Sequence, residues 1–187
     1  NLLDRGALPM DDNGHGTRIA GVIGALGNNS HGITGVMWKA NIMPIKAVDR
    51  SGTGSEVKLA EGIRYAVDQG ADIVVLSLGL YKYSPLMQET VHYAENNGVL
   101  LVAAAGNENK QVKYPAAYPT VLAVGGLDGN RSVPTNSNFG PELDLVAPWR
   151  VYTTILGDDY NYDTGTSMAA PQVAAAAALL LKQHPDL

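Results

Sequence analysis

Two residues of this 187-residue sequence could act together as a nucleophile and its base. Ser167 stands just before an Ala- and Leu-rich run, 173–181, that has strong helix propensity. The start of a helix offers free backbone N–H groups, which favour developing negative charge. A serine hydroxyl attacks a carbonyl only when a neighbouring base accepts its proton. Of the four histidines, His15 stands between two glycines that let the backbone approach closely, and we take it as the candidate base.

Asn107 is the candidate for a third chemical role, the stabilisation of negative charge on a carbonyl oxygen. It follows a run of small residues, 102–106, that predicts a buried strand, and a side-chain amide placed there can donate a hydrogen bond. Taken alone, this stretch is better explained by a strand that ends in an ordinary Gly-Asn turn. Together with Ser167 and His15, it indicates a site for acyl transfer.

The elements that would position these residues alternate between two kinds. Short β-branched runs are apolar almost throughout, as expected for strands buried on both faces. Between them, apolar residues at helical spacing end at Gly70 and Gly98, where glycine favours a helix C-terminus. This order predicts an α/β fold of three layers, in which helices flank a mostly parallel sheet and reactive groups lie at the carboxyl ends of its strands. The predicted strands are 42–48, 73–78, 99–104, 121–124 and 143–147, and the predicted helices include 57–67 and 86–94.

The run 173–181 is apolar all round and carries no charge before Lys182. A helix of this kind is expected in the centre of a core. Pro171 fits the first turn of that helix, where a missing N–H is harmless.

Composition narrows the classes of function. With 45% hydrophobic and 17% charged residues, the chain is typical of one folded domain over 1–187. A net charge of -5 without a basic block argues against nucleic acid and anionic membrane as partners, because both need clustered Lys and Arg. The absence of cysteine excludes disulfides, thiolate nucleophiles and Cys-based zinc sites. The sequence starts at Asn1 with neither an initiator Met nor a signal peptide, so we expect it to be internal to a longer chain.

Three motifs together resemble the subtilisin-like serine peptidase family, and the resemblance spans nearly the whole chain. The motifs are Gly14-His15-Gly16-Thr17, Ala105-Gly106-Asn107 and Gly165-Thr166-Ser167-Met168-Ala169-Ala170-Pro171. The resemblance implies that Ser167 is the nucleophile, that His15 is the general base, and that the Asn107 amide and the Ser167 N–H bind the oxyanion. It also implies a subtilisin-like fold, a peptide or protein substrate, and a secreted or extracellular protein.

The resemblance also assigns a place to the substrate, which this family binds as an added strand. The two flanking stretches would be Gly52-Thr53-Gly54 and Ser77-Leu78-Gly79. The wall of the main side-chain pocket would include Ala103, Ala104, Ala105 and Gly106.

The largest departure from the family is the triad aspartate. In the family it ends a strand that reads like Val-Ile-Asp-Ser/Thr-Gly well upstream of the histidine, and no such strand precedes His15 here. Asp11 and Asp12 are interpreted as solvated or helix-capping residues. The sequence thus holds the dyad of His15 and Ser167 without the aspartate, and it is expected to be truncated at both ends. Two alternatives stay open: a segment or partner chain supplies the aspartate, or the chain is an inactive fragment or a binding module.

No cofactor is required for this chemistry. The resemblance does place a structural calcium at the loop 26–33, where Asn29 would be a ligand. Calcium needs six to eight oxygens, and the family draws some of them from the region absent here, so a complete site is not expected. A propeptide is a further partner that the resemblance suggests.

Two other functions fit the sequence less well. An α/β-hydrolase requires its acid and then its histidine after the nucleophile, whereas only His184 and Asp186 follow Ser167, in the reverse order. A nucleotide-binding module would need Gly-x-Gly-x-x-Gly between a strand and a helix, but Gly21, Gly24 and Gly27 have a different spacing and lie within or after the predicted helix.

Overall fold

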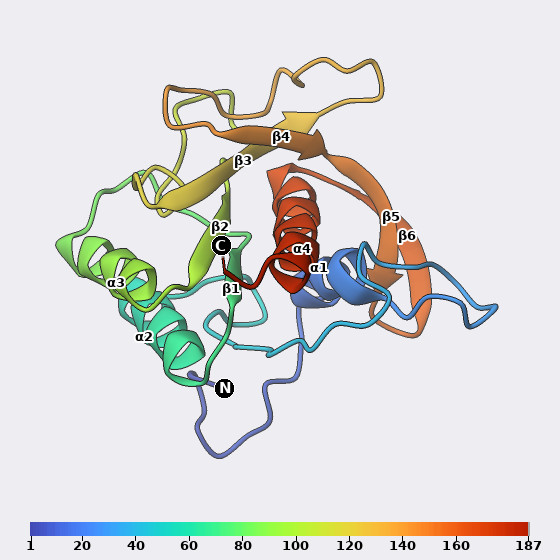
Figure 1. Cartoon of the computed structure of the whole chain (residues 1–187), viewed down its shortest axis with the longest axis horizontal. Helices are drawn as coiled ribbons and strands as arrows, with labels where there is room; N and C mark the ends of the chain where they lie inside the picture. Colours follow the sequence, from blue (N-terminus) through green and yellow to red (C-terminus); the bar gives the residue numbers. More distant parts are fainter. Residues whose placement is uncertain (187) are drawn as a thin grey trace.

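A four-stranded parallel sheet forms the middle layer of the computed structural model, which describes residues 1–186 (Figure 1). The strands stand in the order β1-β2-β3-β4, so chain order and spatial order agree. Each parallel neighbour is reached through a connecting segment that returns to the same end of the sheet. The strands are β1 (Ile73–Leu76), β2 (Leu100–Ala104), β3 (Val121–Leu127) and β4 (Leu145–Pro148).

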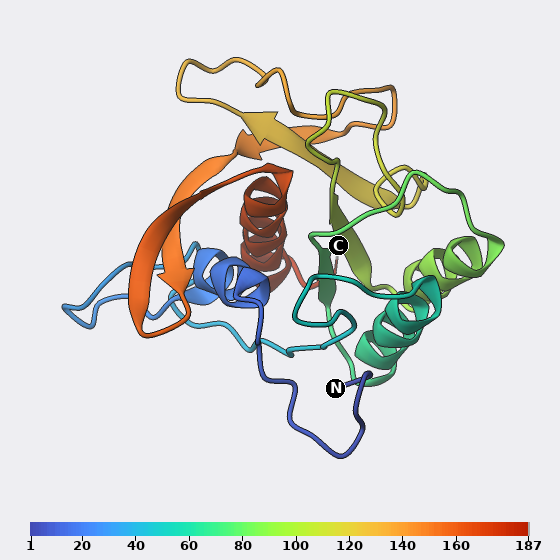
Figure 2. The ribbon, with the colours of Figure 1, turned by 180° about the vertical axis from the view of Figure 1, so that it is seen from behind.

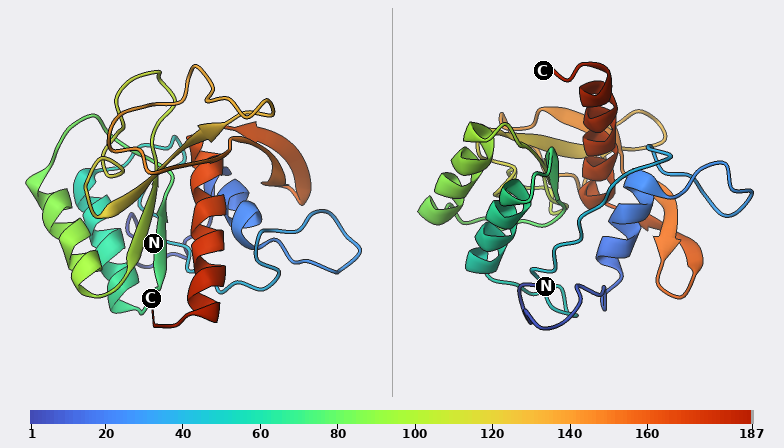
Figure 3. Two further views of the ribbon diagram at one scale, coloured as in Figure 1. Left: turned by 45° about the horizontal axis from the view of Figure 1, so that its top comes forward. Right: turned by 60° about the horizontal axis from the view of Figure 1, so that its bottom comes forward.

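Helices cover both faces of this sheet, which confirms the predicted three-layer α/β fold (Figures 1 and 3). Alternate residues of β2 point to opposite faces. Leu101 and Ala103 pack with α2 (Glu56–Asp68) and α3 (Pro85–Asn96), whereas Val102 and Ala104 pack with α4 (Thr166–Gln183). The remaining helix, α1 (His15–Gly24), packs against α4. No helix in the described part of the chain is long and apolar enough to span a bilayer.

The predicted strand 42–48 is wrong. This segment joins no strand of the sheet and has no regular structure apart from a bridge at Val48, and Ile42 and Met43 are exposed. Its backbone contacts are a bridge between Val48 and Gly54 and a hydrogen bond from the Leu2 N–H to the Lys46 carbonyl. An apolar run becomes a strand only when another strand pairs with it, and β1, the edge of the sheet, pairs within 1–186 with β2 alone.

A two-stranded antiparallel hairpin was not anticipated. It consists of β5 (Arg150–Ile155) and β6 (Asp159–Thr164), and it leads directly into α4 (Figure 2). The strand β5 also packs against α1. Its sequence signal is weak because polar residues and tyrosines alternate in β6, which is largely exposed. The hairpin connects the helix that starts at His15 to the helix that carries Ser167.

Two expectations for the last helix need correction. Its first half is buried, but Leu179 is 41% exposed and Leu180 is 55% exposed, because no described element covers the final turns. Pro171 lies inside α4 and not in its first turn. A proline there lacks the N–H that would bond to the carbonyl four residues earlier, which is that of Ser167.

Candidate active site

The carboxyl end of β2 fixes the side chain of Asn107 in one orientation. Asn107 Oδ1 accepts hydrogen bonds from Thr166 N at 2.8 Å and from Thr166 Oγ1 at 3.0 Å. A backbone N–H can only donate, so the atom that faces it must be the amide oxygen. Thr166 is fully buried, and its hydroxyl also accepts from Gly106 N at 3.0 Å. The Asn107 NH₂ group has no hydrogen-bond partner within residues 1–186 and is available as a donor.

Gly165 leaves room in front of this amide. Its φ angle of 149° belongs to a backbone region that side chains rarely adopt, and a Cβ there would lie 3.2 Å from Asn107 Nδ2. The free NH₂ of Asn107 therefore faces the backbone at the start of α4.

Ser167 is held by a reciprocal pair of hydrogen bonds with Ser77, which follows β1. The Ser77 hydroxyl donates to the Ser167 carbonyl at 3.0 Å, and the Ser167 hydroxyl donates to the Ser77 carbonyl at 3.3 Å. The Ser167 carbonyl is free for this contact because Pro171 cannot donate to it within the helix. The proline inside α4 thereby couples the candidate nucleophile to the end of β1.

His15 is the first residue of α1, and Ser167 is the second residue of α4, the helix against which α1 packs. The side chain of His15 is partly buried, and its ring has no hydrogen-bond partner within residues 1–186. Burial is the main reason that its pKa is lowered; Asp163 opposes this shift and Arg18 adds to it. In this state the Ser167 hydroxyl contacts the Ser77 carbonyl and not the imidazole. Such contacts commonly tighten only when a substrate is bound.

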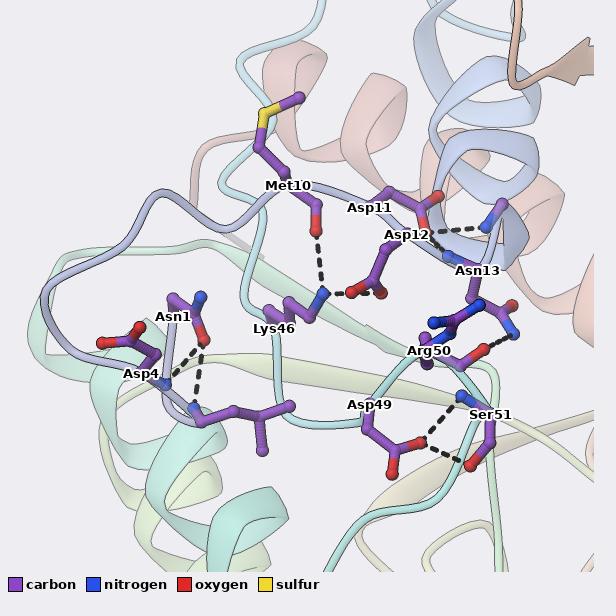
Figure 4. Close-up of polar contacts among 12 residues, drawn as sticks. Asn1, Asp4, Met10, Asp11, Asp12, Asn13, Lys46, Asp49, Arg50 and Ser51 are labelled. Atoms are coloured by element: carbon purple, nitrogen blue, oxygen red, sulfur yellow. Dashed lines mark hydrogen bonds and ion pairs between the residues drawn. The ribbon is translucent and has the colours of Figure 1, made fainter.

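Asp11 organises the start of α1, as the capping interpretation predicts (Figure 4). Its Oδ1 accepts from the N–H groups of Asn13 and Gly14, and its Oδ2 accepts from the N–H and the hydroxyl of Thr17. Burial alone would raise the pKa of this carboxyl, but these hydrogen bonds outweigh it and lower the pKa to about 2. Asp12 instead pairs with Lys46 at 2.6 Å. Both carboxylates therefore have structural partners.

We expect Asp11→Ala to lower the free energy of unfolding by about 1 kcal/mol at neutral pH, as the loss of a helix cap does. The folded-state pKa of about 2 lies below the ordinary 3.8, so the stabilisation is complete above pH 3.8 and disappears as the pH falls towards 2. Urea unfolding of both proteins between pH 7 and pH 2.5 measures this. A stability gap that does not shrink in acid would contradict the assignment.

Comparison with known proteins identifies the family to which this chain belongs. The family model described as Subtilase family matches residues 3–187. The chain belongs to the subtilase family. It is 42% identical over 185 residues to a protein named thermophilic serine proteinase from Bacillus sp. (strain AK1), covering 98% of this chain and 46% of that protein. It is also 42% identical to thermitase from Thermoactinomyces vulgaris over 186 residues, covering 98% of this chain and 66% of thermitase.

A solved structure described as a cold adapted subtilisin-like serine proteinase superimposes on this subtilase chain with a TM-score of 0.90. The two are 31% identical, and the match covers 98% of this chain and 67% of that one. The chain thus spans about half to two thirds of the length of these relatives, two of which are named as serine proteinases.

The two stretches expected to flank a substrate in this subtilase chain line one cavity. Gly52 and Gly54 from the first stretch and Leu78 and Gly79 from the second are among its lining residues, whereas Ser77 is not. Thr53, between the two glycines, is exposed. The same cavity is bordered by a mixture of apolar and polar residues that includes Leu59, Met87, Tyr114, Pro115, Glu56 and Ser84.

The small residues after Val102 have a different environment. Ala103 and Ala105 are fully buried in the core beneath α2 and α3, and Ala104 packs towards α4. Their side chains do not face solvent, so a ligand could meet this segment only through its backbone and through Gly106.

Asn29 lies in an exposed loop, and its Oδ1 accepts a hydrogen bond from the His31 N–H at 3.0 Å. The hollow around it is lined by 28–34, a stretch that contains no carboxylate. Within residues 1–186 no group of three or more His, Cys, Asp or Glu side chains gathers to hold a metal ion. The oxygen donors of this loop are backbone carbonyls and the side chains of Asn, Ser and Thr, and a calcium site would need carboxylate ligands, if any, from elsewhere.

The structure gives two residues contacts that the sequence did not predict: Thr166, and Ser77, which was expected only to flank the substrate. Thr166 orients Asn107, and the hydroxyl of Ser77 contacts Ser167. Thr166 stands inside a recognised motif, but nothing in that motif shows that its hydroxyl reaches back 59 residues along the chain. The role of Ser77 depends on the proline at position 171, and this relation becomes visible only when β1 and α4 are placed side by side.

Proposed function

We propose that this chain supplies the nucleophile, the general base and the oxyanion-binding groups of a serine endopeptidase. Ser167 Oγ attacks the carbonyl carbon of the scissile peptide bond and passes its proton to His15. The negative oxygen that forms accepts hydrogen bonds from Asn107 Nδ2 and from the Ser167 N–H at the start of α4. His15 then gives the proton to the leaving nitrogen, the C–N bond breaks, and an acyl ester on Ser167 remains for water to hydrolyse.

One observation supports this proposal above the others: two hydrogen bonds from Thr166 fix the amide oxygen of Asn107, so that its NH₂ is free beside Gly165, two residues before the nucleophile. A side chain that served only to stabilise a turn would not need to keep its donor free. Electrostatic stabilisation depends on donors that are oriented before the charge appears.

The cavity between Gly52–Gly54 and Leu78–Gly79 suits an extended peptide, because backbone on both sides can pair with an added strand. The substrate in this proposal is a peptide or protein, and the whole protein acts outside the cell, as the family resemblance suggests. A propeptide would bind in the same cavity.

The aspartate of the triad is proposed to come from a segment outside these residues or from another chain. The His15 ring has no hydrogen-bond partner within 1–186, the outer edge of β1 is bare, and 42–48 joins no strand of the sheet. A strand added along β1 would pair with this edge and would bring its carboxyl end towards the same side of the sheet as Ser77.

A second candidate function is that of a binding module without turnover. It is favoured by the direction of the Ser167 hydroxyl, which donates to Ser77 and not to His15, and by the unpaired imidazole. Such a module would keep the peptide cavity and lose the chemistry.

A fluorophosphonate probe separates these candidates. We expect peptide mass mapping to find the label on Ser167, because the reagent needs an activated serine and an oxyanion site. The variant Ser167→Ala should take up no label, and Ser77→Ala, which removes a neighbouring hydroxyl, should still be labelled. If Ser167 stays unmodified in protein whose circular dichroism shows it to be folded, the binding module is the better description.

A further inference from the structure

An ion pair joins the helix that begins at His15 to the strand that leads to Ser167. Arg18 Nε lies 3.2 Å from Asp163 Oδ2, and both side chains are about one-third exposed. Arg18 is one turn after His15 and on the same face of α1, since residues three apart in a helix are neighbours. Asp163 is in β6, four residues before Ser167.

Two hydrogen bonds also join α1 to the hairpin β5–β6. The hydroxyl of Thr153 donates to the Arg18 carbonyl at 2.8 Å, and the hydroxyl of Thr154 donates to the Thr17 carbonyl at 2.8 Å. Gly21 allows the close approach, because a Cβ there would lie only 2.2 Å from Thr154 Oγ1. The first two turns of α1 are thus held by β5, and the ion pair is the contact that reaches β6.

We propose that Arg18 and Asp163 are a positioning pair that holds the start of α1, where His15 lies, against β6 and balances the charge around His15. The inference rests on the proposed function, in which His15 is the general base. Neither residue is given a role in bond making or breaking.

The charged groups around His15 make this proposal testable, because removing Arg18 or Asp163 should shift the pKa of His15 in opposite directions. The charged groups that act on the imidazole within residues 1–186 are Asp163 from β6, Arg18 from α1 and Asp11 from the preceding loop. Burial lowers the pKa of His15 most strongly; Asp163 raises it, Arg18 lowers it, and Asp11 raises it. Since Arg18 and Asp163 are paired, removing one leaves the charge of the other uncompensated.

The experiment is an NMR titration of the His15 ring protons in the 187-residue chain, assigned by comparison with His15→Gln. We expect Arg18→Gln to raise the pKa of His15, because Asp163 is left without its partner. Asp163→Asn should lower it, because Arg18 is left unpaired. The double variant should lie between the two, and Arg18→Lys, which keeps the positive charge, should resemble the unchanged chain.

A merely structural role predicts another pattern. If either substitution only loosens the hairpin from α1, the imidazole gains water and its pKa rises in both variants. Shifts of the same sign, or no shift, would overturn the proposal. If Arg18→Gln does not fold, the sign of the Asp163→Asn shift alone decides. Glu61→Gln removes an ion pair with Lys58 on α2, away from this site, and should leave His15 unchanged.

A second readout concerns turnover in a form of the protein that cleaves peptide. Partly exposed ion pairs are weak, so each single variant should lower kcat by no more than about fivefold with KM nearly unchanged. The acidic limb of the pH–rate profile should move in the same direction as the NMR pKa in each variant. The titration requires no activity, so a form that carries the triad aspartate and still cleaves nothing would contradict the proposed function, whereas the signs of the pKa shifts decide this inference on their own.

Discussion

A form of this chain extended by an upstream strand that ends in Asp-Ser-Gly should cleave a peptide substrate about 10⁴-fold faster than the same form with Asn in place of that Asp. The reason lies in the His15 ring, which has no hydrogen-bond partner within residues 1–186. A carboxylate on its second nitrogen would select the tautomer that can accept the Ser167 proton and would stabilise the imidazolium that forms. The added strand would also pair with the bare edge of β1.

The measurement is kcat for a chromogenic peptide, with the Asn version as the matched control. Both versions carry the same strand, so a difference between them reports the carboxylate and not the completion of the sheet. Equal rates for the two versions would show that the added aspartate does not orient His15. The proposed roles of His15 and Ser167 would then need to be revised.

The second large effect on kcat is expected when Asn107 is substituted. In the extended form, Asn107→Asp should lower kcat by about 10²- to 10³-fold with little change in KM, because a donor to the oxyanion is lost. Aspartate keeps an oxygen for the two hydrogen bonds from Thr166, so the loop should stay in place. Asn107→Ala should cause a similar loss of kcat and in addition should destabilise the fold by about 1 kcal/mol, since two donors lose their acceptor.

Asn109→Gly is the matched control for this series. It removes an amide from the same loop, and its φ of 53° is one that glycine adopts without strain. Its kcat should stay close to that of the unchanged protein. A loss at Asn109 equal to that at Asn107 would indicate disorder of the whole loop and would contradict the proposed donor role.

Much of the central fold was predictable because its residues obey simple rules. Strands β1 to β4 are continuous apolar runs, of which β2 and β3 are buried on both faces, and α2 and α3 end close to the glycines expected to stop them. The segment 42–48 has the same apolar character and still forms no strand. Hydropathy describes one segment at a time, whereas a strand depends on the segment beside it. The polar hairpin β5–β6 was missed for the opposite reason, since its residues face largely outward.

The candidate site divides in a similar way. The types and motifs of His15, Asn107 and Ser167 could be read from the sequence, because each chemical role needs a particular side chain. Their orientations could not be read. Hydrogen bonds from Thr166 orient the amide of Asn107. The carbonyl of Ser167 is free to contact Ser77 because Pro171 lies inside α4 and not in its first turn, where the sequence predicted it. These relations join segments that are distant in sequence.

The contact between the Ser167 hydroxyl and the Ser77 carbonyl has a kinetic consequence. A peptide that pairs along Ser77–Gly79, as proposed, would approach the carbonyl to which the resting hydroxyl is bonded. Release of the hydroxyl from this carbonyl should therefore accompany peptide binding, so that the rate of acylation depends on how far the substrate extends along the backbone. Small esters, which cannot pair with this backbone, should acylate Ser167 more slowly than extended peptides do.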